Sequence, residues 1–320
     1  MKQKLKYYYL YFSTLSQRSH FHKVKIKSLE ETIDDILIHK KSISRYGDGE
    51  LRTMLNKGND IYQPQSPELS KRLKEVLSSD LDNLIIGLPG PLCSVKTEKL
   101  DSKYFWLRFI NLYGDLISEY LNGEKVYGNA GISRFYLGLK DKGLSVHILK
   151  KLKKIWDKKE ILIIEGEFSR MGVGNDLFEN AASLDRLVCP AENAFAKYDE
   201  ILEASKKYGK DKLILIALGP TATILSYDLA KSGFWAIDIG HVDVEYMWML
   251  SKAQTKVPIR GRYVVEALGE RDFEIPEAHR NHYYDSIVDT IGTSLDSPGV
   301  TRGPGQSTHA QNSPRGGSHP

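Results

Sequence analysis

Along the first 121 residues, apolar positions recur at helical intervals. The segments with this spacing are 29–38, 50–56, 67–77 and 101–121. Apolar residues three and four positions apart lie on one face of a helix, so each segment is predicted to be a helix with one buried face. A short apolar run over 83–89 is stopped by its proline. We therefore predict an N-terminal part that consists mainly of helices.

The second half of the chain shows a different pattern, in which continuous apolar runs alternate with longer amphipathic stretches. The runs lie at 160–165, 186–189, 212–218 and 234–239. Runs of this length are typical of strands buried on both faces of a parallel sheet. The predicted fold class is α/β, with a Rossmann-like, mostly parallel sheet and flanking helices, joined to the N-terminal helical part near 140–158.

The two ends of the chain differ in composition from the region between them. Residues 1–27 are basic and aromatic, and residues 294–320 are rich in glycine, proline and serine with almost no apolar residues. The second composition cannot bury a core, so we predict a disordered tail. Region 28–293 has no internal repeat and no long hydrophilic linker, and is predicted to form one compact domain.

The composition bears on the binding partners and on the cellular compartment of the protein. The formal net charge of +4 over 320 residues is too small to indicate nucleic-acid binding. Cys93 and Cys189 are far apart, each in or beside an apolar run, and are predicted to be buried free thiols in a reducing compartment. The sequence shows neither an apolar run long enough for a membrane span nor a secretion signal. We expect a cytoplasmic protein.

The N-terminal extension allows two interpretations. Lysines and aromatic residues stand close together in its first twelve residues, and such a segment can rest at the headgroup region of a membrane. This interpretation predicts a weak peripheral membrane contact. The alternative is a helix or strand that packs on the domain.

Two carboxylates stand close together in segment 44–50, whose sequence is SRYGDGE. Hard divalent cations prefer oxygen ligands, and Asp48 and Glu50 on one tight turn are spaced to share such an ion, with water and phosphate in its other positions. Arg45 and Gly47 lie beside them and are predicted contacts of a nucleotide diphosphate. The alternative is an ordinary solvated turn in which Arg45 neutralises the acids.

The polar loop 165–177 follows the first apolar run. Ligands bind beyond the carboxyl ends of strands in an open parallel sheet, so this loop is a candidate site. It is predicted to open a helix whose first amides favour an anion, to which Arg170 would add a phosphate contact. The alternative is a plain turn with a helix cap. The candidate ligands in the loop are Glu167, Ser169, Arg170, Gly174 and Asn175.

Two further loops have a similar design. Gly219 and Thr221 follow the third apolar run, where a threonine can cap the next helix and offer a hydroxyl to a ligand. Asn129 and Arg134 lie in another polar loop and are predicted to contact the diphosphate or the sugar. For both loops, a turn that leads into a helix is the alternative interpretation.

Acid and imidazole groups gather after the last apolar run. His241, Asp243 and Glu245 share one face if the segment is extended, whereas His241 and Glu245 share one face if it is helical. A partly desolvated carboxylate has a raised pKa and suits the removal of a proton from an acceptor hydroxyl. Glu245 or Asp243 is the predicted general base. His241 is a further catalytic candidate, although a single histidine is more often structural.

Taken in order, these motifs resemble the GT-D-type glycosyltransferases, a family first described as the domain of unknown function DUF1792. The likeness runs from about residue 28 to about residue 290. Its D-x-E motif corresponds to Asp48 and Glu50. The motifs that carry it are RYGDGE at 45–50, GN at 128–129, GE, SR and GND within 166–176, GPTA at 219–222, and GHVD with a following glutamate at 240–245.

The resemblance implies a donor, a cofactor and a mechanism. The donor would be a UDP-sugar, with UDP-glucose expected because the described streptococcal member of the family uses it to glycosylate an adhesin. Mn²⁺ or Mg²⁺ would be held through Asp48 and Glu50. The metal, Arg170 and helix amides would stabilise the departing UDP, while Glu245 or Asp243 takes the proton of the acceptor.

The acceptor expected from the resemblance is a glycan on a glycoprotein or on a lipid-linked polysaccharide. Two other functions would use the same residues. One is a sugar-nucleotide hydrolase or phosphotransferase, with water as the acceptor in the hydrolase. The other is a non-catalytic nucleotide-binding module, in which the acids hold a structural ion.

Overall fold

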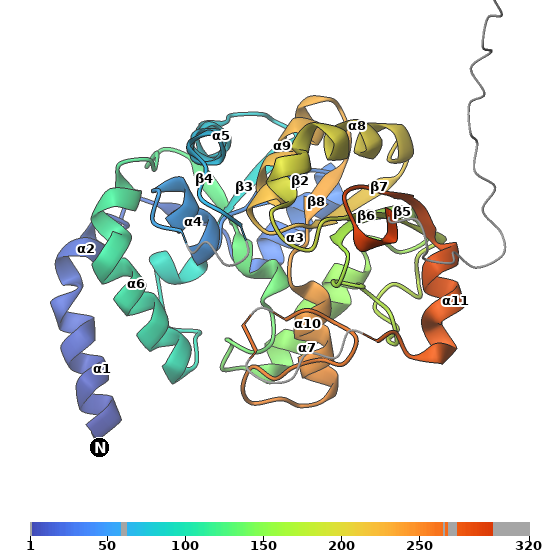
Figure 1. Cartoon of the computed structure of the whole chain (residues 1–320). Coiled ribbons are helices and arrows are strands. Elements are labelled where there is room, and N and C mark those ends of the chain that lie inside the picture. The colour runs from blue at the N-terminus through green and yellow to red at the C-terminus, as the bar shows by residue number, and fades with distance from the viewer. Residues whose placement is uncertain (1, 59–62, 265, 268–273, 297–320) are drawn as a thin grey trace, which may run out of the picture.

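The computed structural model describes residues 2–58, 63–264, 266–267 and 274–296, which form a nine-stranded sheet with helices on both faces (Figure 1). Every strand pair is parallel, and the order is β1-β4-β3-β2-β8-β7-β5-β6-β9. The strands are β1 Lys25–Ile26, β2 Ser42–Arg45, β3 Leu84–Leu88, β4 Val126–Asn129, β5 Glu160–Gly166, β6 Ser183–Cys189, β7 Leu213–Ala217, β8 Ala236–Asp238 and β9 Ile287–Thr290. The predicted α/β class with a parallel sheet is confirmed.

The sheet consists of two blocks that are each continuous along the chain. Strands β1–β4 form one block and β5–β9 form the other, and the two meet at β2 and β8. The register across this boundary rests on the pair Ile43 and Ile237. The N-terminal part is therefore more than the helical part predicted from the sequence, because it also supplies four strands of the common sheet.

Helices cover both faces because successive strand residues point to opposite sides. In β5, Ile161 and Ile163 belong to a core beneath α3, α7 and α10, whereas Leu162 and Ile164 belong to a core beneath α8 and α9. The helices are α1 Lys2–Ser13, α2 Leu15–Ser19, α3 Leu29–His39, α4 Asp48–Met54, α5 Pro67–Ser78, α6 Leu100–Ser118, α7 Lys142–Lys153, α8 Tyr198–Tyr208, α9 Pro220–Lys231, α10 Val242–Leu250 and α11 Glu277–Asp285.

Helix α6 covers part of the sheet, because its Ile110 belongs to the same buried core as Ile86 of β3. Helices α1 and α2 pack on α6 at one side of the molecule (Figure 1). The ring of Tyr7 contacts that of Tyr104 on α6, with 6.3 Å between the ring centroids. The alternative in which the N-terminal extension packs on the domain as a helix is thus realised.

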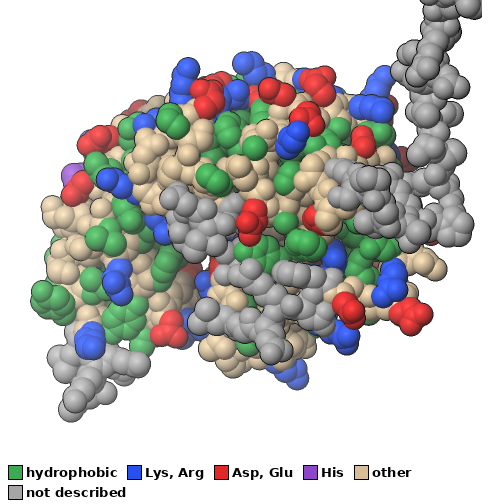
Figure 2. All heavy atoms as spheres, viewed as in Figure 1, with side chains coloured by type: hydrophobic (Ala, Val, Ile, Leu, Met, Phe, Trp, Pro, Cys, Tyr) green, Lys and Arg blue, Asp and Glu red, His purple; other side chains and the backbone are tan. Residues whose placement is uncertain are grey.

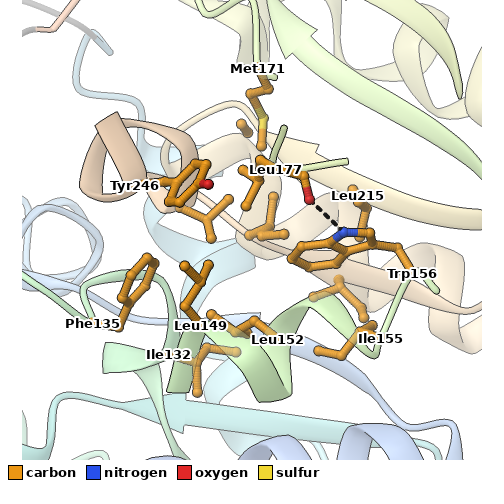
Figure 3. Close-up of a cluster of buried hydrophobic side chains, with 14 of the residues drawn as sticks. Ile132, Phe135, Leu149, Leu152, Ile155, Trp156, Met171, Leu177, Leu215 and Tyr246 are labelled. Carbon is orange, nitrogen blue, oxygen red and sulfur yellow. Dashed lines mark hydrogen bonds between the residues drawn. The ribbon is translucent and has the colours of Figure 1, made fainter. Parts of the chain in front are cut away.

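The connection between β5 and β6 differs from the prediction. Residues 167–182 form turns, and the helix that the loop 165–177 was predicted to open is absent from this described segment. A buried cluster fixes the segment instead (Figure 3). Met171 and Leu177 point into it, and the indole nitrogen of Trp156 donates to the carbonyl oxygen of Leu177 at 2.9 Å. Hydrophobic anchoring therefore replaces helical hydrogen bonds here.

Three smaller predictions concern the start of α4, the two cysteines and the C-terminal tail. The helix predicted from residue 50 begins at Asp48, which places both acids of the D-x-E motif in its first turn. Cys189 is a buried free thiol as predicted, but Cys93 is exposed, because it follows the short turn after β3 instead of lying in a strand. Of the tail predicted to be disordered, Ser294–Asp296 forms a short 3₁₀ turn, and residues 297–320 lie outside the described residues.

Candidate active site

A cavity of about 1290 Å³ opens at the carboxyl edge of the sheet. Ligands of open α/β sheets bind at this edge. Residues at or after the carboxyl ends of strands β1–β8 line the cavity, and the first turns of α6 form a further part of its wall. The residues after β2, β3, β4, β7 and β8 are 45–50, 89–91, 129–131, 219–220, and 238 with 240–241. Both blocks of the sheet therefore contribute to one site.

Arg45 and Asp238 form an ion pair across the boundary between the blocks. Nη2 of Arg45 lies 2.7 Å from Oδ1 of Asp238, and its Nε donates to the carbonyl oxygen of Asp238 at 2.7 Å. Nη1 donates to the carbonyl oxygen of Ala130 at 3.0 Å. The predicted diphosphate contact is thus held at the cavity wall by the ends of three strands. Asp238 was not predicted, although it ends an apolar run.

The two acids of the D-x-E motif both line the cavity. Oε2 of Glu50 accepts a hydrogen bond from the backbone nitrogen of Gly47 at 2.8 Å, and Oδ2 of Asp48 lies 3.1 Å from Nη2 of Arg52. Burial raises the pKa of Glu50, and the negative charge of Asp238 raises it further. A cation bound at this place would relieve the repulsion between these carboxylates.

The donor set also limits what kind of metal site is possible. Within the described ranges, no group of three or more His, Cys, Asp or Glu side chains is arranged to hold an ion. The protein offers the two carboxylates of Asp48 and Glu50. Magnesium sites that serve nucleotides typically use one or two carboxylates and complete the shell with water and phosphate. The residues therefore fit a divalent cation that is shared with a bound diphosphate.

Glu245 reaches the cavity wall from the first turn of α10 and is almost fully buried. Its Oε2 accepts hydrogen bonds from the backbone nitrogens of Tyr136 at 2.9 Å and Leu137 at 2.7 Å. Its Oε1 makes a longer contact of 3.9 Å with Nη1 of Arg134. Burial raises the pKa of Glu245, while Arg134 and the two amides act in the opposite direction. The carboxylate is thus oriented through one oxygen, as a general base requires.

Asp243 has a different environment, although it too borders the cavity. Its Oδ1 accepts hydrogen bonds from the backbone nitrogen of Gly172 and from Nδ2 of Asn175, both at 2.8 Å. Its Oδ2 lies 2.5 Å from Nε of the buried Arg262. These bonds attach the turn at 172–175 to α10. Both carboxylate oxygens of Asp243 are therefore engaged in bonds within the protein.

His241, Arg134 and Glu266 form a polar cluster at the cavity wall. Nη1 of Arg134 donates to Oε2 of Glu266 at 3.0 Å, and Nε2 of His241 lies 3.8 Å from Oε1 of Glu266. Burial and the positive charge of Arg134 lower the pKa of His241 to about 3. The imidazole is therefore neutral at physiological pH. Because the segment that follows His241 is the helix α10, His241 and Glu245 lie on the same side of it, as predicted for a helical segment.

The loop after β5 contributes less to the site than predicted. Ser169 lines the cavity, but Glu167, Arg170, Gly174 and Asn175 do not. Arg170 is buried and donates to the carbonyl oxygen of Gly261 at 3.0 Å, and Glu167 accepts from the backbone nitrogen of Ser294 at 3.0 Å. The predicted helix N-terminus is also missing here. Arg134, which lines the cavity and contacts Glu245, is therefore closer to the predicted base than Arg170, which does not line it.

The loops after β4 and β7 both reach the cavity. Asn129 and Gly219 line it. Gly219 has φ +54° and precedes α9, so the turn into this helix uses a conformation that glycine adopts without strain. Thr221 is buried inside α9, with its hydroxyl 3.4 Å from Oε1 of Gln63, and so the predicted threonine cap is wrong.

The structure also adds residues that no sequence motif indicated. Glu98 lines the cavity, is buried, and accepts a hydrogen bond from the hydroxyl of Ser102 at 2.5 Å. Burial raises the pKa of this carboxyl group. Phe105 and Trp106 from α6 provide an aromatic wall nearby. No motif surrounds these residues, and only the packing of α6 brings them to the site.

This fold and cavity agree with one family. A model of the glycosyltransferase GT-D fold matches residues 43–267, which include the D-x-E motif and Glu245. The chain belongs to the GT-D glycosyltransferase family.

Two streptococcal glycosyltransferases are similar to the chain. It is 36% identical over 268 residues to the probable glycosyl transferase Gly of Streptococcus gordonii and 36% identical over 253 residues to the glycosyltransferase GlyD of Streptococcus pneumoniae serotype 4. These alignments cover 83% and 78% of this chain but 38% and 31% of the relatives, so the chain spans about a third of their length.

Two solved structures cover most of the chain. One, described as a DUF1792 domain with a distinct glycosyltransferase fold, superposes with a TM-score of 0.81 at 36% identity and covers 87% of this chain and 100% of its own. The other, a DUF1792 glycosyltransferase from Streptococcus sanguinis, superposes with a TM-score of 0.78 at 36% identity and covers 84% of this chain and 99% of its own.

Proposed function

We propose that this chain transfers a hexose, with glucose as the first candidate, from a UDP-sugar to a glycan acceptor. The observation that supports this most directly is the position of Glu245, a buried and oriented carboxylate in the same cavity wall as Asp48 and Glu50. A base and a diphosphate site in one cavity are the two requirements of a direct displacement at the anomeric carbon.

Glu245 is our candidate for the general base. Two backbone amides hold one oxygen, and the second makes only the longer contact with Arg134 among the groups described. Asp243 uses both oxygens to hold Arg262 and the turn at 172–175. A carboxylate occupied in this way is a poor proton acceptor, because protonation would break structural bonds.

The departing UDP needs positive charge or amide donors. Arg134 lies in the cavity wall, and α9 begins there at Pro220 with the positive end of its dipole. A divalent ion held by Asp48 and Glu50 would neutralise developing charge on the diphosphate. In this proposal, Arg134, the start of α9 and the metal site stabilise the departing UDP. This is the role that the sequence had suggested for Arg170 and for a helix after β5.

Replacing Asp48 by asparagine tests the metal site. We expect calorimetry to show manganese-dependent binding of one UDP-sugar from a panel to the unchanged chain, and at least tenfold weaker binding to the variant, because one of two carboxylate ligands is lost. Arg52→Gln is the matched control, since it removes the ion-pair partner of Asp48 and leaves the ligand. Unchanged affinity of Asp48→Asn with manganese present would exclude this ligand.

Product analysis separates transfer from hydrolysis. The purified chain is incubated with the bound UDP-sugar and a panel of glycans, and free sugar and elongated glycan are measured. Release of free sugar at the same rate with and without every glycan would favour the hydrolase, and binding without turnover would favour the non-catalytic module.

We also infer a cytoplasmic location, where UDP-sugars and reduced thiols are available, with the N-terminal extension as a peripheral membrane contact. In the part of the chain that the structure describes, no helix combines the length and hydrophobicity that a membrane span requires. The acceptor would then be a glycan on a glycoprotein or on a lipid carrier.

A further inference from the structure

Helices α1 and α2 leave large apolar side chains in solvent. The exposed fractions are 55% for Tyr8, 76% for Tyr9, 62% for Phe12 and 50% for Leu15. In α1, Tyr8, Tyr9 and Phe12 lie within one sector of the helix, opposite the side that contacts α6 through Tyr7. These four exposed side chains form what we term the aromatic face. An apolar surface of this kind indicates an interaction site.

The charge of the N-terminal segment indicates what covers the aromatic face. The first 28 residues contain seven Lys and Arg and no Asp or Glu, whereas the rest of the chain has a slight acidic excess. Lys6 is exposed on α1, and Arg18 stacks over the ring of Tyr11 at 3.9 Å. Aromatic side chains between cations are typical of helices that lie in the headgroup region of anionic bilayers.

The neighbouring helix α6 has a different surface. Figure 2 shows hydrophobic side chains gathered over α1 and α6, at the left of the view, with Lys and Arg among them. Helix α6 exposes Phe105, Leu112 and Leu116, but it also carries exposed carboxylates. These are Asp101, Asp115, which lies 3.2 Å from Nε2 of His20, and the flanking Glu119. Anionic lipid is therefore assigned to α1 and α2 and not to α6.

We propose that the aromatic face docks the protein on an anionic lipid bilayer. Helix α1 packs on α6, and the first turns of α6 line the cavity, so a single helix separates the docked surface from the candidate active site. Resting on the proposed transferase function, this arrangement favours an acceptor glycan that is carried by a lipid of the same bilayer. Such an acceptor reaches the cavity without leaving the membrane surface.

Co-sedimentation of the full chain with vesicles tests the proposal. We expect binding to vesicles of phosphatidylglycerol and phosphatidylcholine, little binding to phosphatidylcholine alone, and weakening by salt. Replacing Tyr8, Tyr9 and Phe12 by serine should reduce the partition coefficient at least about tenfold. Lys6→Gln should reduce it about fivefold. The control variant changes three exposed apolar residues elsewhere, Val146, Leu250 and Val257, to serine, and should bind as the unchanged chain does.

Several outcomes would overturn the proposal. These are no binding to the anionic vesicles, equal binding by the aromatic triple variant and the control variant, or equal binding to neutral and anionic vesicles. A dimer in light scattering that the triple variant abolishes, without vesicle binding, would show that a second copy covers the face. Thermal unfolding checks that the variants fold. UDP-sugar binding, measured in parallel without vesicles, keeps failure of membrane docking separate from failure of the transferase function.

Discussion

Glu245→Gln is expected to lower the rate of sugar transfer by about 10²–10⁴-fold, the usual contribution of a general base. Glutamine keeps the size of the side chain and can still accept from the amides of Tyr136 and Leu137, so UDP-sugar affinity should change little. The pKa of Glu245 is raised by burial, so the rate of the unchanged enzyme should rise with pH through a value above that of an ordinary glutamate. The transfer rate of the variant should not show this rise with pH.

The matched control for this experiment is Asp243→Asn. Because Asp243 pairs with the buried Arg262, we expect this variant to lower the unfolding temperature, and its remaining folded fraction should keep the pH dependence of transfer. A variant Glu245→Gln that transfers sugar at the normal rate, together with a folded but inactive Asp243→Asn, would move the base to Asp243.

Arg186→Met is expected to destabilise the protein by about 3–5 kcal/mol at pH 7.5, because it leaves the fully buried carboxylate of Glu165 without its cation. Nη1 of Arg186 lies 2.5 Å from Oε1 of Glu165, and Oε2 accepts from the backbone nitrogen of Met171 at 2.7 Å. Burial already raises the pKa of Glu165 in the unchanged chain. Without Arg186 this pKa rises further, so the loss of stability should be smaller at pH 5 and grow as the pH increases.

Urea unfolding at both pH values measures this effect. The double variant Glu165→Gln/Arg186→Met removes the charge as well as its partner and should recover much of the lost stability. Lys212→Met breaks a partly exposed ion pair between Lys212, which precedes β7, and Asp185 of β6, and should cost less than about 1 kcal/mol. Equal losses for Arg186→Met and Lys212→Met would contradict the argument from burial.

Most of the fold could be predicted where a segment is long enough to show its period. The runs that became β5 and β7, and the helices α3 and α5, each bury a regular set of apolar residues. Strands β1, β2 and β4 have two to four residues each, which is too few to show alternation. They exist because neighbouring strands complete their hydrogen bonds, and such pairing between distant segments is not written in local spacing.

The candidate site was predictable to a similar extent. The positions after strand ends were found, since topology brings them to one edge, and Asp48, Glu50 and Glu245 do line one cavity. The sequence did not reveal that Arg170 turns away from that cavity, nor that Glu98 faces it. Both depend on packing between segments that are far apart in the chain, the first on Gly261 and the second on the placement of α6.

The boundary between β2 and β8 is the place where the two blocks that form the cavity are joined. Side chains join the two blocks there: the hydroxyl of Ser42 bonds the backbone at 234 and 236, Arg45 bonds Asp238, and α9 packs across both strands. A ligand that contacts residues of both blocks would add further contacts across this boundary. Loss of the Ser42 hydroxyl would weaken the same boundary from outside the cavity, because Ser42 does not line it.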